Sequence, residues 1–399
     1  MNLNDIKKTD SQYHMPAYAR FDLLLKSGKG ATAYDNTGKD YIDFSSGIGV
    51  NSLGFCDEGH IAAVTAQMNT LQHMSNLFYN EPQALLARSL CEKTGYSKVF
   101  FCNSGAEANE CAIKLARKYS FDNNGAESGC NQIISLVNSF HGRTITTLAA
   151  TGQTVFHNYF FPFTDGFCHA DASSFESIKA LYNDKTCAVM IETVQGEGGV
   201  LPLEHDFVNA LVKFCKDKNL LIICDEIQTG IGRTGKLLAQ EHYGLKADIV
   251  TLAKGLGGGL PIGACLCTEE LGGTLSASMH GTTFGGNPVV CAGANYVLDK
   301  LSDKDLLSEV SKKGEYFKEK LLKIKGVSNV RGLGLMIGIE LDPGVGEAKN
   351  IISECIKNGL IALTAKTLVR FLPPLNITYK EIDTGLERFS AVLKNATNN

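Results

Sequence analysis

Two residues of opposite charge follow neighbouring apolar runs of the sequence and could do chemistry together. Asp225 comes directly after the run Leu221–Cys224, and Lys254 follows the run Asp248–Ala253, 29 residues further along. Ligands of a parallel α/β sheet bind at the carboxyl ends of its strands, so both side chains are expected at one edge. A lysine shielded from water is a suitable amine for condensing with a carbonyl group.

This pair is what pyridoxal phosphate requires of a protein: a lysine for a Schiff base and a carboxylate that keeps the pyridine nitrogen protonated. Gly255, Gly257, Gly258 and Gly259 follow Lys254 and would leave space for a cofactor and a substrate. A salt bridge at a strand end, or a solvated lysine before a flexible loop, is the plainer explanation of either residue alone. The combination with two further motifs favours the cofactor.

The first of these motifs, at residues 101–110, has the pattern of a strand end, a glycine turn and an amphipathic helix. Ser104 and Glu107 have capping-box spacing, so the sequence predicts that a helix begins after the glycine turn, at Ala106. Free amides at a helix N-terminus bind phosphate. A well-capped helix without a ligand is the alternative, because this pattern is common. The sequence has no G-x-x-x-x-G-K-[ST] phosphate loop.

The second motif, at residues 139–143, also follows an apolar run. Phe140 could stack on a planar cofactor, and Arg143 offers a planar fork for a substrate carboxylate. His141 between them is, taken alone, more often a structural histidine than a catalytic one.

Short apolar runs alternate with helical patterns between residues 98 and 268, which predicts an α/β fold with a mostly parallel sheet. The expected strands are Lys98–Phe101, Gln132–Val137, Cys187–Ile191, Leu220–Cys224, Asp248–Ala253 and Ile262–Cys267, and the expected helices include Ala106–Tyr119 and Phe207–Asn219. The two ends of the chain have an α+β pattern, with expected strands at Thr32–Asp35, Tyr41–Ser45 and Gly332–Leu341 and expected helices at Cys291–Leu301, Leu306–Lys323 and Ala348–Asn358. We expect an N-terminal arm and part of a small domain at 1–60, a large domain at 61–290 and the rest of the small domain at 291–399.

Composition excludes several classes of protein. The 399 residues carry a net charge of −4, and no basic run is typical of nucleic-acid or membrane-surface binding. No stretch reaches ~18 consecutive apolar residues, so no transmembrane helix is expected. Thirteen cysteines without zinc-site spacing favour a reducing compartment and no metal. Because no secretory segment begins the chain, we expect a cytoplasmic protein.

Six motifs in order resemble the class III pyridoxal-phosphate aminotransferases, which have the aspartate-aminotransferase fold (fold type I). The resemblance covers roughly residues 15–395. It implies a large domain with a mostly parallel seven-stranded sheet and a smaller α+β domain built from both termini. The matching stretches are Asn103–Glu110, Phe140–Arg143, Glu192–Gly199, Asp225–Gly235, Lys254–Gly259 and His280–Pro288.

Roles in this family follow by resemblance. Lys254 would bind the cofactor covalently and move the proton, Asp225 would pair with the pyridine nitrogen, and Gln228 would approach the phenolic oxygen. Thr283 would reach the phosphate of a neighbouring subunit, which implies a homodimer with its active sites at the interface. Many relatives have threonine where Ala106 stands, so here only a backbone amide would serve the phosphate. The full set of expected cofactor-binding residues is Ser104, Gly105, Ala106, Phe140, Asp225, Glu226, Ile227, Gln228, Lys254 and Thr283.

The resemblance is nearest to members that act on N2-acetylornithine and 2-oxoglutarate. One arginine can hold the far carboxylate of both substrates, and we expect it to be Arg143; the resemblance implies that Thr282 lies near substrate. Glu197 would cover Arg370 in one half-reaction and swing aside in the other, whereas a fixed structural pair is the plainer alternative. Gly47 supplies no hydroxyl for a free α-amine, where ornithine aminotransferases carry a tyrosine in this segment, which favours an acylated donor.

Four alternatives differ in substrate or chemistry. Another ω-aminotransferase of the family would act on succinylornithine, succinyldiaminopimelate, ornithine or 4-aminobutyrate. An aminomutase would need no 2-oxoglutarate. A dinucleotide-dependent enzyme would use one of the glycine clusters, and a silent binding protein would not need Lys254 and Asp225.

Overall fold

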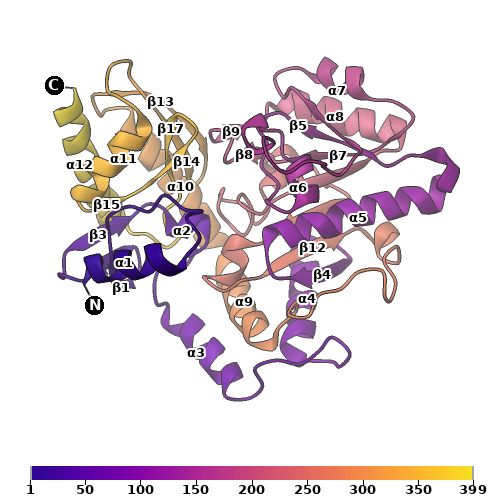
Figure 1. Cartoon of the computed structure of the whole chain (residues 1–399), viewed down its shortest axis with the longest axis horizontal. Helices are drawn as coiled ribbons and strands as arrows, with labels where there is room; N and C mark the ends of the chain where they lie inside the picture. The colour runs from indigo at the N-terminus through magenta and orange to yellow at the C-terminus, as the bar shows by residue number, and fades with distance from the viewer. Residues whose placement is uncertain (1, 398–399) are drawn as a thin grey trace.

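The chain forms two halves, each built around its own sheets (Figure 1). The structure is a computed structural model, and it describes residues 2–397. The elements of the central part of the chain gather in one half, and those near the two termini gather in the other. No helix in the described range is long and apolar enough to cross a membrane.

The large half contains the expected seven-stranded sheet, in the order β4-β12-β11-β10-β7-β5-β6. The antiparallel pairs are β4·β12 and β12·β11, and the other four neighbours pair in parallel. All six expected strands are present, with every end within one residue of the expected one. The strands are β4 (Lys98–Cys102), β5 (Gln132–Leu136), β6 (Phe167–Ala170), β7 (Thr186–Ile191), β10 (Leu221–Asp225), β11 (Ile249–Leu252) and β12 (Gly263–Cys267).

Helices cover this sheet, and its central strands are buried along their whole length, as expected for mostly apolar runs. Helix α5 contacts β4, β12 and β11, while α8 contacts β10. Helix α3 packs along α9, whose first turn holds Pro288. The helices of this half are α3 (Glu58–Met68), α4 (Glu81–Thr94), α5 (Gly105–Asn124), α6 (Ile145–Ala150), α7 (Phe175–Leu181), α8 (His205–Lys218) and α9 (Pro288–Leu301).

The small half combines both ends of the chain. One sheet has the order β1-β2-β3-β15, so the C-terminal strand β15 (Leu360–Ile361) pairs in parallel with the N-terminal strand β3 (Asp40–Asp43). The second sheet has the order β13-β14-β17-β16. The remaining elements are β1 (Leu25–Lys29), β2 (Thr32–Asp35), β13 (Val327–Leu333), β14 (Met336–Leu341), β16 (Leu363–Ala365), β17 (Leu368–Phe371), α1 (Leu3–Tyr13), α2 (Ser46–Gly49), α10 (Lys304–Leu321), α11 (Ala348–Lys357) and α12 (Tyr379–Ala396).

One local expectation was wrong, and some elements were not expected. The single strand expected at Gly332–Leu341 is the end of β13 and all of β14, which form a hairpin that turns at Gly334 with φ +54°. A side chain at Gly334 would lie 2.5 Å from the carbonyl carbon of Thr234, so only glycine fits this turn. Strand β6 and helix α1 had no sequence signal, because the first is four residues long and the second has no buried residue.

A buried guanidinium ties the two halves together. Arg233, in the loop after β10, donates from Nη1 to the carbonyl oxygens of Leu335 (3.1 Å) and Pro373 (2.5 Å). Burial lowers the pKa of Arg233 to about 9, against the attraction of Asp43. Its Nε and Nη2 have no hydrogen-bond partner in the described part of the chain.

The predicted domain boundaries at residues 60 and 290 stay a prediction.

Candidate active site

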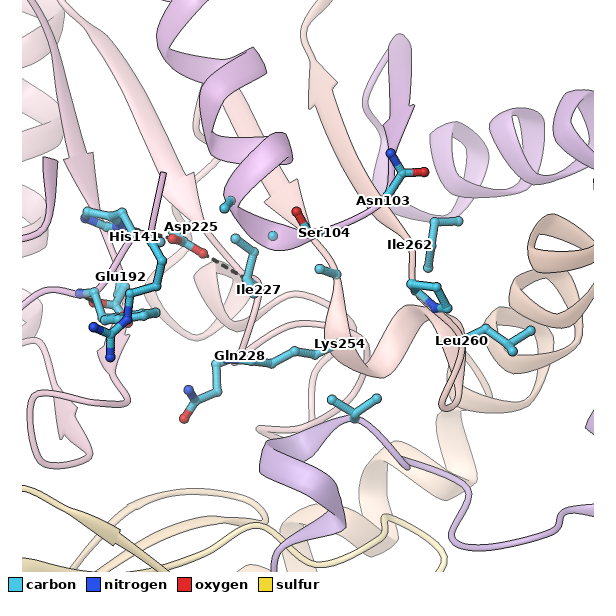
Figure 2. Close-up of a pocket in the computed structure, with 18 of the residues that line it drawn as sticks. Asn103, Ser104, His141, Glu192, Asp225, Ile227, Gln228, Lys254, Leu260 and Ile262 are labelled. Carbon is cyan, nitrogen blue, oxygen red and sulfur yellow. Dashed lines mark hydrogen bonds and ion pairs between the residues drawn. The ribbon is translucent and has the colours of Figure 1, made fainter. Parts of the chain in front are cut away.

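A cavity of about 440 Å³ opens at the carboxyl ends of the parallel strands (Figure 2). Its lining brings together most of the residues predicted from the sequence. These are Ser104, Gly105, Ala106, Phe140, Arg143, Asp225, Ile227, Gln228 and Lys254. Asn103, His141 and Glu192 also line it, and sequence reasoning gave them no role.

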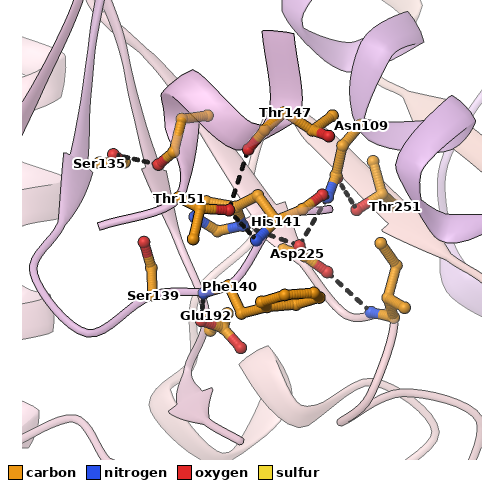
Figure 3. Close-up of polar contacts among 12 residues, drawn as sticks. Asn109, Ser135, Ser139, Phe140, His141, Thr147, Thr151, Glu192, Asp225 and Thr251 are labelled. Carbon is orange, nitrogen blue, oxygen red and sulfur yellow. Dashed lines mark hydrogen bonds and ion pairs between the residues drawn. The ribbon is translucent and has the colours of Figure 1, made fainter. Parts of the chain in front are cut away.

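The carboxylate of Asp225 is held as a hydrogen-bond acceptor at the end of β10 (Figure 3). Its Oδ2 accepts from Asn109 Nδ2 at 2.7 Å and lies 2.8 Å from His141 Nδ1, while Oδ1 accepts from the amide of Ile227 at 3.0 Å. Only 3% of Asp225 is exposed. Several donors to one buried carboxylate fix its orientation. Such a group can hold a proton on a ligand nitrogen in the cavity.

His141 and Asn109 position that carboxylate, and both are fully buried. Asn109 donates a second hydrogen bond to the His141 carbonyl oxygen at 2.7 Å and accepts from the Thr251 hydroxyl at 2.8 Å. Because the Asp225 oxygen accepts, the His141 proton is assigned to Nδ1. The available signal for Asn109 was a polar residue on the buried face of an amphipathic helix, and His141 was weighed only as a structural histidine.

Lys254 lies one strand away from Asp225. The two strands are parallel neighbours in which Asp225 is level with Thr251, so Lys254 follows shortly after that point. Lys254 starts a short 3₁₀ turn and has a φ of +41°, an uncommon value for a residue with a side chain. Burial lowers the pKa of the Lys254 amine, against the opposing attraction of Glu197. A lysine with a lowered pKa has more of the neutral, nucleophilic amine at neutral pH.

The N-terminus of α5 forms the third side of the cavity. Ser104 caps the helix by accepting from the Glu107 amide at 3.2 Å, as the sequence predicts. The expected reciprocal bond is shifted by one residue, because Glu107 accepts from the amide of Asn103 (2.5 Å) rather than of Ser104. A side chain at Gly105 would lie 2.9 Å from the Ile227 side chain, so glycine allows this close approach. The free amides of the first turn are suited to a phosphate.

Aromatic rings and a cation lie near the mouth of the cavity. The amide of Phe140 donates to Glu192 Oε2 at 3.0 Å, which fixes the backbone beneath the ring. Burial raises the pKa of Glu192 to about 7. The exposed Arg143 lies over the Phe156 ring, with its guanidinium carbon 4.1 Å from the ring centre. Its planar fork is therefore held at the edge of the cavity, where it can meet an incoming carboxylate.

The predicted ion pair between Glu197 and Arg370 is present. Arg370 Nη1 donates to Glu197 Oε1 at 2.7 Å and to Gln228 Oε1 at 3.0 Å. The Gln228 amide in turn donates to Glu197 at 3.3 Å. Burial raises the pKa of Glu197, but Arg370 more than offsets this, so the net pKa is lowered. This triad lies beside Lys254. Gln228 and Lys254 line the same cavity, and the Glu197 carboxylate attracts the charged form of the Lys254 amine.

Besides Glu197 and Arg370, three predicted site residues lie outside the cavity lining. The buried Glu226 carboxylate turns away to accept from the Thr229 hydroxyl and from the amides of Ala239 and Gln240, because these donors stabilise it there. Thr282 accepts from Asn103 at 2.9 Å, beside a second cavity of about 480 Å³. Thr283 is exposed. The cavity that contains Lys254 and Asp225 is therefore formed without either threonine.

Together these groups fit pyridoxal phosphate. The cavity presents an amine of lowered pKa, a buried carboxylate held by three donors, a helix N-terminus and the ring of Phe140. Each meets one demand of the cofactor: its aldehyde, pyridine nitrogen, phosphate and ring face. The absence of a side chain at Gly105 brings Ile227 against the start of α5 and closes the cradle.

Residues 13–393 match the family model described as "Aminotransferase class-III". An acetylornithine aminotransferase from Haemophilus ducreyi is 50% identical over 98% of this chain and 99% of that protein. A succinylornithine transaminase from Yersinia pestis is 44% identical over 96% of this chain and 95% of that protein. Among solved structures, the ornithine aminotransferase of Toxoplasma gondii aligns with a TM-score of 0.94 and 32% identity over 100% of this chain and 96% of that chain.

Proposed function

This chain belongs to the class-III aminotransferase family, and from that premise we propose that it transfers the terminal amino group of N2-acetylornithine to 2-oxoglutarate. The products are N-acetylglutamate 5-semialdehyde and glutamate. The observation that carries the proposal is the shared cavity of Lys254 and Asp225 at the ends of two parallel strands. The enzyme is pyridoxal-phosphate dependent, as its family is.

Bound pyridoxal phosphate supplies an electron sink for the substrate carbon that loses a proton. Lys254 would hold its aldehyde, Asp225 its pyridine nitrogen and the first turn of α5 its phosphate. Phe140 would cover one face of the ring and Gln228 would approach the phenolic oxygen. His141 and Asn109 add the support that keeps Asp225 aimed at the nitrogen.

Lys254 is also placed to move the proton. Its amine takes a proton from the substrate carbon that bears the amino group and later returns one, acting as general base and then as general acid. The lowered pKa suits both roles, because a general acid–base group works best with a pKa near the operating pH.

The two substrates place different charges beside Lys254. N2-acetylornithine carries its carboxylate far from the reacting carbon, whereas glutamate has one carboxylate beside it and another far away. Arg143, at the mouth, would hold the far carboxylate of either. Arg370 would hold the near carboxylate, and Glu197 would cover that cation when no such carboxylate is present, since an unpaired buried charge is costly.

Succinylornithine is the second candidate donor, because relatives of that activity are nearly as similar. Gly47 supports an acylated donor over free ornithine. It belongs to a short left-handed turn with φ +61° and ψ +44°, a conformation that disfavours larger residues, and it carries no hydroxyl for a free α-amine. A side chain there would meet only the Asn51 amide at 3.8 Å, so the backbone conformation rather than crowding disfavours one.

A homodimer with shared active sites is part of the proposal. Thr283 is exposed next to the exposed Phe284, and the segment that holds the exposed Leu77, Phe78 and Tyr79 is tied to this one by the Asn76 amide, which donates to the Gly285 carbonyl oxygen. A second copy that covers these residues would bring Thr283 to the phosphate of its neighbour. Sedimentation of the purified protein tests this: a monomer at micromolar concentration would contradict it.

Cytoplasmic location stays a prediction.

Glutamate formation from a panel of amine donors with 2-oxoglutarate tests the function. We expect kcat/KM to be highest for N2-acetylornithine, with succinylornithine second and free ornithine and 4-aminobutyrate at least tenfold lower. A preference for free ornithine would overturn the substrate assignment. Absence of 2-oxoglutarate-dependent glutamate formation with every donor would overturn the reaction.

A further inference from the structure

A small cavity of about 180 Å³ lies apart from the active site and shares no lining residue with it. It is enclosed by β4, α5, β12 and the segment 271–280. Its lining includes Cys111 of α5, Cys265 and Cys267 of β12, and His280. We call these four residues the thiol pocket. The three cysteines belong to one buried cluster and all are free.

His280 is held in a defined state within the thiol pocket. Its ring packs on Phe100 with centres 4.7 Å apart, and its Nδ1 lies 3.0 Å from Lys114 Nζ. An ammonium group can only donate, so Nδ1 accepts and the ring proton is on Nε2. The ring held in this way presents its Nε2–H group as a donor to the thiol pocket.

Cys111 differs from the other buried cysteines. A hydrogen bond from the Cys265 thiol, together with one from His280, lowers the pKa of Cys111 to about 6 in spite of its burial. The pKa of Cys265 is correspondingly raised well above its ordinary value. By contrast, burial raises the pKa of Cys187, Cys291 and Cys355 to about 12. The thiolate is the nucleophile, so Cys111 is the reactive member of the set.

We propose that Cys111 and Cys265 form a reversible disulfide when the protein meets a hydroperoxide, with Cys111 as the attacking thiol and Cys265 as the resolving thiol. The Cys111 thiolate attacks one oxygen of hydrogen peroxide, the O–O bond breaks, and a proton from water accompanies release of one water. The resulting sulfenic acid is attacked by the Cys265 sulfur, whose proton leaves with the hydroxyl group as a second water. Peroxide is the two-electron oxidant and the pair of thiols is oxidised.

The position of this pair matters because α5 and β12 also meet at the active site. Helix α5 begins at the phosphate cradle, six residues before Cys111. Strand β12 begins at Gly263, two residues before Cys265, and a side chain at Gly263 would lie 2.2 Å from the Ser104 carbonyl oxygen. A disulfide would therefore link the two elements close to the contact that shapes the cradle.

The test is peroxide treatment of the cofactor-loaded enzyme at pH 7, followed by digestion without reductant and mass spectrometry. We expect a peptide pair that joins Cys111 to Cys265, loss of two of the thirteen thiols, and recovery of both with dithiothreitol. In Cys265→Ser, Cys111 should stop at the sulfenic acid and be labelled by dimedone. Cys291→Ser is the matched control and should leave the linked pair unchanged.

His280→Ala provides a second readout that does not depend on replacing a cysteine. Loss of its hydrogen bond should raise the pKa of Cys111 and slow peroxide-dependent thiol loss several-fold at pH 7, with a smaller difference at pH 9. Oxidation that spares Cys111, or that joins other cysteines while Cys111 stays reduced, would overturn the proposal. Equal rates of oxidation for Cys111 and Cys291 would overturn it as well.

Discussion

Arg370 donates a hydrogen bond of 2.7 Å to Glu197, and the two partners differ sharply in exposure. The Arg370 side chain is 3% exposed, whereas that of Glu197 is 30% exposed. Arg370 is therefore held inside the protein, and Glu197 is the partner with solvent beside it. If one member of the pair moves during turnover, it is the carboxylate.

Glu197→Ala should separate the two half-reactions. With the carboxylate gone, Arg370 is uncovered when N2-acetylornithine binds, and the donor half-reaction should slow by at least tenfold, because an unpaired buried charge costs about 3 kcal/mol or more. The glutamate half-reaction should be spared or improved. Single-turnover absorbance changes of the cofactor, measured for each half, are the readout. Equal losses in both halves would leave a fixed structural pair as the explanation.

The two arginines should differ in the same assay. Arg370→Ala should slow the 2-oxoglutarate half most, because the near carboxylate loses its partner. Arg143→Ala should impair both halves, since the far carboxylate is common to all substrates, and the effect should fall mainly on KM. Arg388→Ala is a control, because Arg388 pairs with Asp40 in the small half and does not line the cavity. An Arg143→Ala enzyme with ordinary KM values would remove that residue from substrate binding.

Lys254→Ala should retain the fold and bind the cofactor without a covalent bond, but its turnover should collapse. General acid–base help alone contributes ~10²–10⁴-fold, and the variant loses the covalent attachment too. Steady-state rates and borohydride trapping of the cofactor on the protein measure the two losses. Lys246→Ala, at an exposed lysine, should change neither. Near-normal turnover of Lys254→Ala would show that another group moves the proton.

Asp225→Asn should bind the cofactor yet lose turnover by on the order of 10²-fold, because a neutral amide replaces a charged hydrogen-bond partner worth ~1.5–3 kcal/mol. Cofactor absorbance as a function of pH reports the loss of the ring proton. Asp248→Asn makes the same chemical change beside the neighbouring strand, where the carboxylate accepts from the Ile222 amide. It should alter stability only. If Asp225→Asn behaves in the same way, Asp225 is a structural group.

His169 predicts an acid-sensitive contribution to stability. Burial, with help from the nearby His157 and His141, lowers the pKa of His169 to about 4 from an ordinary value of 6.5. The unfolded chain binds this proton at higher pH, so the contribution is complete above pH 6.5 and is lost as the pH falls toward 4. The size is about 3 kcal/mol.

Unfolding by urea at pH 7.5 and pH 4.5 checks this expectation in the wild type and in His169→Gln. The loss of unfolding free energy between the two pH values should be smaller in His169→Gln than in the wild type. His73→Gln, at an exposed histidine, is the matched control. Identical pH dependence in wild type and His169→Gln would contradict the assignment.

The parts of the site that follow strand ends could be predicted from the sequence. Lys254 and Asp225 stand directly after apolar runs, and parallel pairing of β10 and β11 brings them to one edge. The support around Asp225 could not be predicted, because Asn109 and His141 come from elements 116 and 84 residues away. Only the packing of α5 on the sheet brings Asn109 to Asp225.

The expected place of Glu226 illustrates the opposite difficulty. Its neighbours Asp225 and Ile227 both line the cavity, but the Glu226 carboxylate points away from it and accepts from the backbone amides of Ala239 and Gln240. The direction of a side chain at a strand end depends on the loop that folds back against it. Here that loop is residues 238–241, and the sequence of the strand does not indicate that it will pack there.

The buried Arg233 has a consequence for how the enzyme exchanges its substrates. Its Nη1 donates to two carbonyl oxygens of the small half. One belongs to Leu335, in the β13–β14 turn, and the other to Pro373, three residues beyond Arg370. Swinging the small half away from the sheet would break both bonds and expose a desolvated guanidinium. We therefore expect the two halves to keep their relative positions while substrates enter and leave, with only single side chains rotating. Crystals of this protein should accordingly tolerate alternate soaking with both substrates without cracking.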